Sequence, residues 1–198
     1  MITWIVLRAA GVGAYLAFFA SVAWGLMGTS SLFGRRFSKQ SFILIHQFLS
    51  TAGLVLLGTH LTGLLVDRFV PFGPLDVLVP MRSEFRPVAV ALGVISMYLA
   101  VLVLGTSYAR KRVGPVWWRR IHLLAVPMFA LALVHGVAAG TDVQQPWMWW
   151  TYLVTGGAVL FLLLVRGLTH GVRPVRAPRP EHARARVPAP ETVAEPAA

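Results

Sequence analysis

Five long apolar blocks constrain this chain more than any other feature of its sequence. They cover residues 4–27, 42–66, 88–108, 121–139 and 148–165. Each block has about the 20 apolar residues that an α-helix needs to cross a bilayer. All seven acidic residues lie outside the blocks. The pattern predicts an all-α polytopic membrane helix bundle with five transmembrane helices, and it excludes an ordinary water-soluble domain.

The composition agrees with a membrane protein. The chain is 57% hydrophobic and only 13% charged, whereas a soluble domain has about 25% charged residues. The seven tryptophans fall at the ends of the blocks, as in an interfacial aromatic belt. The absence of cysteine excludes disulfides, iron–sulfur clusters, thiolate ligands and covalently attached haem. The first block has no basic stretch before it and no small-residue cleavage site, which favours a retained helix over a signal peptide.

The loop charges predict the topology of the chain. Basic residues favour the cytoplasmic side of a membrane, so the N-terminus is expected outside and the C-terminus inside the plasma membrane. The net charge of +11 then reflects this topology, and no nucleic-acid partner is expected. The basic residues gather after the first block (Arg35, Arg36, Lys39) and after the third (Arg110, Lys111, Arg112, Arg119, Arg120).

Two segments lie outside the apolar blocks. Residues 1–170 are expected to form the membrane domain, and residues 171–198, rich in Pro, Ala and Arg, a disordered cytoplasmic tail. The long outer connection has an apolar middle, Pro74–Pro80, that is too short to span the bilayer. This segment is expected to lie on the outer membrane surface or over the mouth of the bundle.

Four of the six histidines lie within the apolar blocks, where ionisable side chains are costly and usually mark a site. His46 and His60 belong to the second block, and His122 and His135 to the fourth. His46 and His60 are 14 residues apart, which is about 21 Å along a helix and about 40° around it. These two side chains therefore cannot bind one small ion together.

The second and fourth helices run in the same direction, so their histidines can meet across the bundle. Ser38 is a suitable N-cap for the second helix, and Gly114 before Pro115 suits the start of the fourth. His46 and His122 each lie eight residues beyond these starts. Two pairs at two depths are therefore predicted: His46 with His122, and His60 with His135.

Two imidazoles that reach across a bundle, with no further ligand at that level, suit the axial positions of a haem. Gly53, Gly58 and Gly63 surround His60 in the sequence, and small residues there would let a macrocycle approach the helix. The alternative interpretation of these glycines is close packing between helices.

Two other interpretations of the histidines remain open. A pair of imidazoles also suits Cu(I), but a soft ligand would be expected nearby, and Met27 and Met128 are the only candidates. Alternatively, each histidine is neutral and hydrogen-bonded to a neighbouring hydroxyl, such as that of Ser50, Thr51 or Thr59.

Haem propionates need cations. Arg8, Arg82 and Arg86 are candidates at the outer level. Arg119 and Arg120 are candidates at the inner level, although topology alone also explains them.

The fourth helix contains a geometric problem. His122 and His135 are 13 residues apart, which places them about 140° apart around a straight helix. Pro127 lies between them and is expected to kink or rewind the helix. Phe129 falls between the two levels, where it fills the gap between the two cofactors or belongs to the core.

The histidine spacing resembles that of the ferric reductase-like transmembrane domain. This superfamily includes NADPH oxidases, ferric reductases and the bacterial haem subunit that supplies electrons to periplasmic methionine sulfoxide reductase. The segments Trp118-Arg-Arg-Ile-His122 and Leu133-Val-His135-Gly-Val-Ala-Ala-Gly-Thr-Asp142 also resemble bacterial members. The resemblance covers about residues 4–168 and implies that His46, His60, His122 and His135 ligate haem b.

This resemblance implies a membrane cytochrome b that moves electrons across the membrane through two haems. The sequence contains no glycine-rich nucleotide loop, so, unlike the oxidases, it is expected to have no flavin or nicotinamide site and to be the haem subunit of an oxidoreductase. Expected donors are a cytoplasmic flavoprotein or quinol, and expected acceptors are an external redox protein, a flavin or a ferric chelate. The superfamily core usually has six helices, whereas five are predicted here. A proton-coupled small transporter and a cofactor-free structural membrane subunit are the alternatives.

Overall fold

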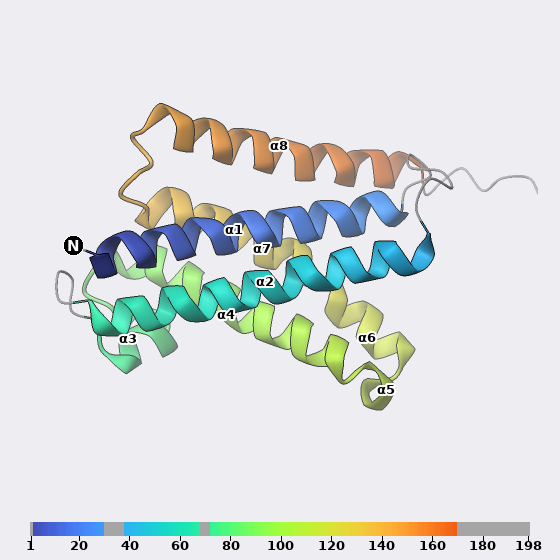
Figure 1. The fold of residues 1–198 in the computed structure, drawn as a ribbon, viewed down its shortest axis with the longest axis horizontal. Coiled ribbons are helices and arrows are strands. Elements are labelled where there is room, and N and C mark those ends of the chain that lie inside the picture. The colour runs from blue at the N-terminus through green and yellow to red at the C-terminus, as the bar shows by residue number, and fades with distance from the viewer. Residues whose placement is uncertain (1, 30–37, 68–71, 170–198) are drawn as a thin grey trace, which may run out of the picture.

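The computed structural model describes residues 2–29, 38–67 and 72–169, and within these ranges it contains helices and no strand (Figure 1). The predicted tail at 171–198, together with Arg35 and Arg36, lies outside the described residues. The helices are α1 (Ile2–Thr29), α2 (Lys39–Val66), α3 (Pro74–Leu78), α4 (Pro87–Tyr108), α5 (Arg110–Val113), α6 (Pro115–His122), α7 (Ala125–Ala139) and α8 (Pro146–Thr169).

The prediction of an all-α membrane bundle is confirmed at the level of its spans. Five spans in the described residues are long and apolar enough to cross a bilayer: Ile2–Gly28, Lys39–Val66, Pro87–Tyr108, Pro115–Ala139 and Pro146–Leu168. Each begins before the corresponding apolar block, because polar and proline-containing first turns extend the helix beyond its hydrophobic part. Four of the five starts lie within three residues of the predicted ones, and the fourth span begins six residues earlier than predicted.

The two predicted helix starts are confirmed. Ser38 is the N-cap of α2, and its hydroxyl accepts a hydrogen bond of 3.0 Å from the backbone N–H of Ser41. Gly114 precedes α6, with Pro115 in the first turn. Proline suits this place because a first-turn N–H has no intrahelical partner to lose.

The fourth span, predicted over 121–139 with a kink or rewinding at Pro127, is present and consists of α6 and α7 with a tight turn between them, so the expected rewinding is confirmed. Two hydrogen bonds of the tighter i to i−3 type close this turn, from the N–H of Leu124 to Ile121 and from the N–H of Val126 to Leu123. Pro127 explains the break, since it lacks an N–H and its ring would clash with the carbonyl of Leu123, four residues earlier. Each residue in the tighter turn adds about 20° of rotation, which reduces the predicted mismatch between His122 and His135.

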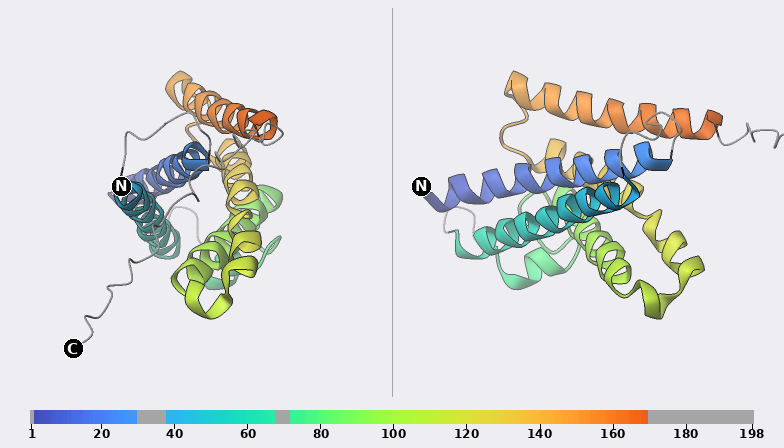
Figure 2. Two further views of the ribbon diagram at one scale, coloured as in Figure 1. Left: turned by 90° about the vertical axis from the view of Figure 1, so that its right-hand side faces the viewer. Right: turned by 45° about the vertical axis from the view of Figure 1, so that its right-hand side comes forward.

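The long helices form two antiparallel pairs. Helix α1 packs along α2, and α4 packs along α7, while α8 lies against α1 and α7 (Figures 1 and 2). Glycines bring α1 and α2 close together: a Cβ at Gly63 would lie 2.5 Å from Leu7, and one at Gly53 would lie 2.8 Å from Phe18. By contrast, α2 approaches α4 only slightly. In this arrangement α2 and α7, the helices that carry His60 and His135, do not pack directly along each other.

A short helix or a pair of short helices lies at each end of the bundle. One end holds α3, together with the start of α1 and the last turns of α2, and the other end holds α5 and α6 (Figure 1). Within the apolar segment predicted to lie on the membrane surface or over the mouth of the bundle, Val77 of α3 is buried. It contributes to the cavity described below, so α3 covers that end.

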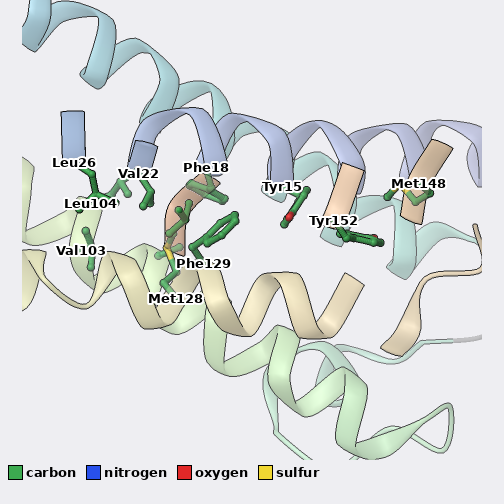
Figure 3. Close-up of a cluster of buried hydrophobic side chains, with 12 residues drawn as sticks. Tyr15, Phe18, Val22, Leu26, Val103, Leu104, Met128, Phe129, Met148 and Tyr152 are labelled. Atoms are coloured by element: carbon green, nitrogen blue, oxygen red, sulfur yellow. The ribbon is translucent and has the colours of Figure 1, made fainter. Parts of the chain in front are cut away.

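The buried core occupies the middle of the bundle (Figure 3). Phe129 of α7 is only 2% exposed and stacks on Tyr15 of α1, with ring centroids 5.5 Å apart. Tyr15 also contacts Tyr152 of α8 edge-on, at 5.3 Å. These rings join α1, α7 and α8 at the height of Phe129, which is therefore a core residue in this structure.

Candidate functional site

His60 and His135 lie at the end of the bundle that holds the start of α1, and together they are called level A. Both line a largely apolar cavity of about 240 Å³ that is bounded by α1, α2, α4, α7 and α8. Leu57, Val94 and Met97 are among its apolar lining residues. The cavity therefore places two imidazoles from different helices at the edge of one apolar space.

The imidazoles of level A are oriented in the same way. His60 Nδ1 lies 2.8 Å from the backbone oxygen of Leu7, and His135 Nδ1 lies 2.8 Å from that of Ala89. A carbonyl oxygen only accepts hydrogen bonds, so each Nδ1 carries the proton and donates. Each Nε2 then keeps its lone pair. Metal-ligating histidines usually have this tautomer, in which the other ring nitrogen donates a hydrogen bond that fixes the ring.

A glycine four residues after each acceptor makes room for the ring. A Cβ at Gly11 would lie 2.9 Å from His60 Nδ1, and a Cβ at Gly93 would lie 2.7 Å from His135 Nδ1. Helical side chains tilt toward the N-terminus, so the side chain at i+4 covers the carbonyl at i. Glycine at i+4 leaves the carbonyl of Leu7 or Ala89 open to an imidazole from the neighbouring helix.

His46 and His122 lie toward the other end of the bundle and are called level B. Their ring centroids are 5.9 Å apart, with the rings inclined at 70°. His46 Nδ1 lies 3.3 Å from the hydroxyl of Ser21, and a Cβ at Gly25 would meet the same ring at 3.3 Å. Ser21 and Gly25 repeat the spacing of four residues seen at level A.

His122 has a different environment. Its Nδ1 is buried and has no hydrogen-bond partner among the described residues. Its ring stacks on Trp118, one turn earlier in α6, with centroids 5.1 Å apart and an interplanar angle of 28°. A buried polar atom without a partner is unusual in a folded protein, which makes His122 Nδ1 a candidate contact for a bound group.

The two levels are far apart along the bundle. Both His46 and His60 belong to the continuous helix α2, so their separation of 14 residues corresponds to about 21 Å. The rings of Tyr15 and Phe129 belong to the core between them. The predicted pairing by depth is therefore seen in the structure, as His46 beside His122 and as His60 and His135 around one cavity.

The hydroxyls considered as histidine partners bond elsewhere. Ser50 bonds to Ser21 at 2.7 Å, Thr51 to the hydroxyl of Tyr108 at 2.7 Å, and Thr59 to the carbonyl of Val55 at 3.0 Å. The hydroxyl alternative is thus wrong for the three residues named, although Ser21 supplies such a contact to His46.

The structure places the five candidate arginines differently. Arg8 lines the cavity, forms an ion pair with Asp142 and lies over the ring of Trp4 at 5.4 Å. Arg86 donates a hydrogen bond of 2.6 Å to the carbonyl of Ala138 outside the cavity. The remaining three are exposed: Arg82, Arg119 and Arg120.

For two of the glycines singled out in the sequence, the alternative interpretation of close helix packing is confirmed. Gly53 and Gly63 accommodate Phe18 and Leu7 in the packing of α1 on α2, and nothing lies within 4 Å of a Cβ at Gly58. Gly11 and Gly25 meet the histidines instead, and their separation of 14 residues matches that of His60 and His46 on the antiparallel neighbour. That matched spacing was the signal that could have identified them.

The described residues hold no group of three or more His, Asp or Glu side chains able to bind one metal ion. Met128, considered as a copper ligand, is 3% exposed and belongs to the core cluster. No protein-family model matches the chain, and no curated protein and no solved structure matches it.

Proposed function

We propose that the protein is a membrane cytochrome b of the ferric reductase-like superfamily, which transfers electrons across the plasma membrane through two haems. The observation that carries the proposal is the presence of two histidine pairs, one near each end of an apolar bundle. The ligands would be His60 with His135 at level A and His46 with His122 at level B.

The residues of the two levels fit haem in their donor chemistry. At level B the imidazoles of His46 and His122 come from different helices and lie with ring centroids 5.9 Å apart, so both would be within reach of one bound group. At level A, Gly11 and Gly93 leave room for the imidazoles of His60 and His135, whose Nδ1 atoms donate to backbone carbonyls and whose Nε2 atoms keep a lone pair for a metal. The buried Nδ1 of His122, which has no hydrogen-bond partner among the described residues, is a further nitrogen that a bound group could satisfy.

Haem, when bound, supplies an iron that takes up and releases one electron at a time, and the protein controls access to it. The carbonyls of Leu7 and Ala89 fix the direction of the two imidazoles at level A. The lining of the cavity is largely apolar, and Arg8 at its edge is paired with Asp142, which also lines the cavity. A propionate carboxylate would be held on this side, where it would replace Asp142 as the partner of Arg8.

The direction of transfer follows from the charge of the two ends. Basic residues of α5 and α6 favour the cytoplasmic side, which would put level B inside and level A outside, with the N-terminus external. The donor would then be a cytoplasmic flavoprotein or quinol, and the acceptor an external redox protein, flavin or ferric chelate.

Transmembrane electron transfer can be tested in sealed lipid vesicles. Purified protein loaded with haem is inserted into vesicles that contain dithionite, and membrane-impermeant ferricyanide is added outside. We expect ferricyanide reduction that requires the protein and stops in a His46→Ala, His60→Ala double variant. Proton or solute movement without ferricyanide reduction would contradict the proposal and favour the transporter alternative.

Arg8→Gln is expected to weaken haem binding at level A by about tenfold or more, because a hydrogen bond to a charged group is worth about 1.5–3 kcal/mol. Haem affinity can be followed by transfer of haem to apomyoglobin. Asp142→Asn keeps the Arg8 cation and should retain haem, and Arg86→Gln is a control outside the cavity. Equal loss in Arg8→Gln and Arg86→Gln would show that Arg8 has no specific role.

Pro127→Ala is expected to restore the helix between α6 and α7 and to rotate His122 away from His46. Removing the proline restores an N–H at residue 127 and relieves the clash with the Leu123 carbonyl. The haem at level B should be lost while that at level A is kept, as measured by haem content per chain. Pro146→Ala, in the first turn of α8, should change nothing. Unchanged haem in Pro127→Ala would mean that the turn at Leu123 does not depend on the proline.

A further inference from the structure

The end of the bundle formed by α5 and α6 carries a concentrated positive charge. Five cationic side chains there are exposed, and none forms an ion pair with a carboxylate of the described residues. We call this set the α5–α6 surface; it consists of Arg110, Lys111, Arg112, Arg119 and Arg120.

The acidic residues of the described chain lie elsewhere. Asp67 caps the end of α2, Asp76 lies in α3, and Glu84 precedes α4. Asp142 follows α7 and pairs with Arg8 of α1. The end of α2, α3, the start of α4 and the end of α7 lie at the end of the bundle opposite α5 and α6 (Figure 1). Within the described residues, the carboxylates and the cations of the α5–α6 surface therefore lie at opposite ends, and no described carboxylate offsets the field of this surface.

Trp118 connects this surface to level B. The guanidinium of Arg110 lies over its ring, 4.4 Å from the centroid, and the other contact of the ring is with His122 at 5.1 Å. The indole N–H donates a hydrogen bond of 3.2 Å to Ser107 of α4, which fixes the ring. One side chain therefore separates an exposed arginine from a histidine of the site.

The neighbouring Trp117 offers a contrast. It is 61% exposed and lies under Arg120, with the guanidinium 5.3 Å from its ring centroid. The described structure records a ring contact with His122 for Trp118 and none for Trp117. Beside Trp118, a shallow hollow is lined by Ser107, Tyr108 and residues 110–112. The basic side chains of residues 110–112, the hollow and the indole of Trp118 therefore lie together on one side of the α5–α6 surface.

We propose that the α5–α6 surface is the docking site of a soluble electron-donor protein with an acidic face, such as a reduced flavoprotein. In this proposal the electron passes from the docked protein to level B through Trp118. This inference rests on the proposed function. In each encounter the flavin of the partner loses one electron, and the group held by His46 and His122 gains it, with no bond formed or broken. Complementary charge steers such encounters. A lipid headgroup would satisfy the cations but would not need Trp118 beside His122.

Docking can be tested with flavodoxin as an acidic probe and cytochrome c as a basic one. Haem-loaded protein is held in phosphatidylcholine nanodiscs, and binding is measured against ionic strength. Flavodoxin should bind and be released by salt, and cytochrome c should not bind. Replacing residues 110–112 together by glutamine should weaken flavodoxin binding about tenfold or more. Arg82→Gln, an exposed change at the opposite end, should leave it unchanged.

Two outcomes would overturn the docking surface. One is flavodoxin binding that the glutamine variant does not alter. The other is binding abolished by phosphatidylglycerol in the nanodisc, which would assign the cations to anionic lipid. The same assay on protein prepared without haem separates the two proposals. Flavodoxin binding by a chain that never takes up haem would refute the proposed function alone, whereas haem uptake without binding would refute the docking surface alone.

The role of Trp118 has its own test. Trp118→Leu should slow the reduction of the protein by flavodoxin severalfold while leaving the flavodoxin Kd unchanged, and Trp118→Phe should restore part of the rate. Haem content and the low-spin spectrum check that level B is intact. Trp117→Leu is the matched control, since that ring has no contact with His122 in the structure. Equal slowing in both leucine variants would overturn the assignment of Trp118.

Discussion

His60→Ala is expected to lower the haem content from about two to about one per chain, because haem held by two axial imidazoles loses one of its protein ligands. The loss should concern level A alone, since His46 and His122 lie about 21 Å away along the bundle. The measurement is haem per chain from the pyridine haemochrome spectrum, together with the low-spin signal in electron paramagnetic resonance.

The pairing of the histidines makes this result more specific. His135→Ala should have the same effect as His60→Ala, and the double variant should lose no more, because both act on one haem. His46→Ala should remove the other half. Thr155→Ala is a suitable control, since it removes a buried hydrogen bond to Tyr15 and no imidazole. Additive losses from His60→Ala and His135→Ala would show that the two side chains do not share one group.

Gly93→Ala is expected to be nearly as damaging to level A as loss of a ligand. The new methyl group would lie 2.7 Å from both Nδ1 and Cε1 of His135, so the imidazole must move away from the carbonyl of Ala89. The displaced ring loses a hydrogen bond and its direction toward the cavity. We expect haem at level A to be lost or to become high-spin, and any haem that remains to have a shifted midpoint potential.

The same helix offers a matched control. A Cβ at Gly105 in α4 has nothing within 4 Å, so Gly105→Ala should keep both haems and stabilise the helix by about 1 kcal/mol. Gly11→Ala should behave like Gly93→Ala, because its Cβ would meet His60 at 2.9 Å. A Gly93→Ala protein with unchanged haem content and spectrum would contradict the orienting role of the glycine and the Ala89 carbonyl.

The membrane spans and the histidine pairs could be predicted from the sequence because both depend on local signals. Apolar length alone defines a span, and Ser38 and Gly114 fix where the two histidine-bearing spans begin. Equal distances from those starts then give equal depths. The pairing of His46 with His122 follows from this register without knowledge of the other helices.

The partners of the histidines could not be predicted in the same way. His60 and His135 donate to backbone carbonyls of α1 and α4, and every residue has such a carbonyl. Only the packing of the helices selects Leu7 and Ala89. The sequence predicted a kink or rewinding at Pro127 but not the position of the turn. The turn lies earlier because the ring of Pro127 would clash with the carbonyl of Leu123, four residues before it.

The central claim of two bis-histidine haems is tested most directly by an oxidised-minus-reduced optical spectrum of the purified protein, with haem quantified per chain. Two low-spin haems per chain are expected, in agreement with the histidine pairs of level A and level B. A protein produced with ample haem that still binds none would contradict the claim, and the four histidines would then require another explanation.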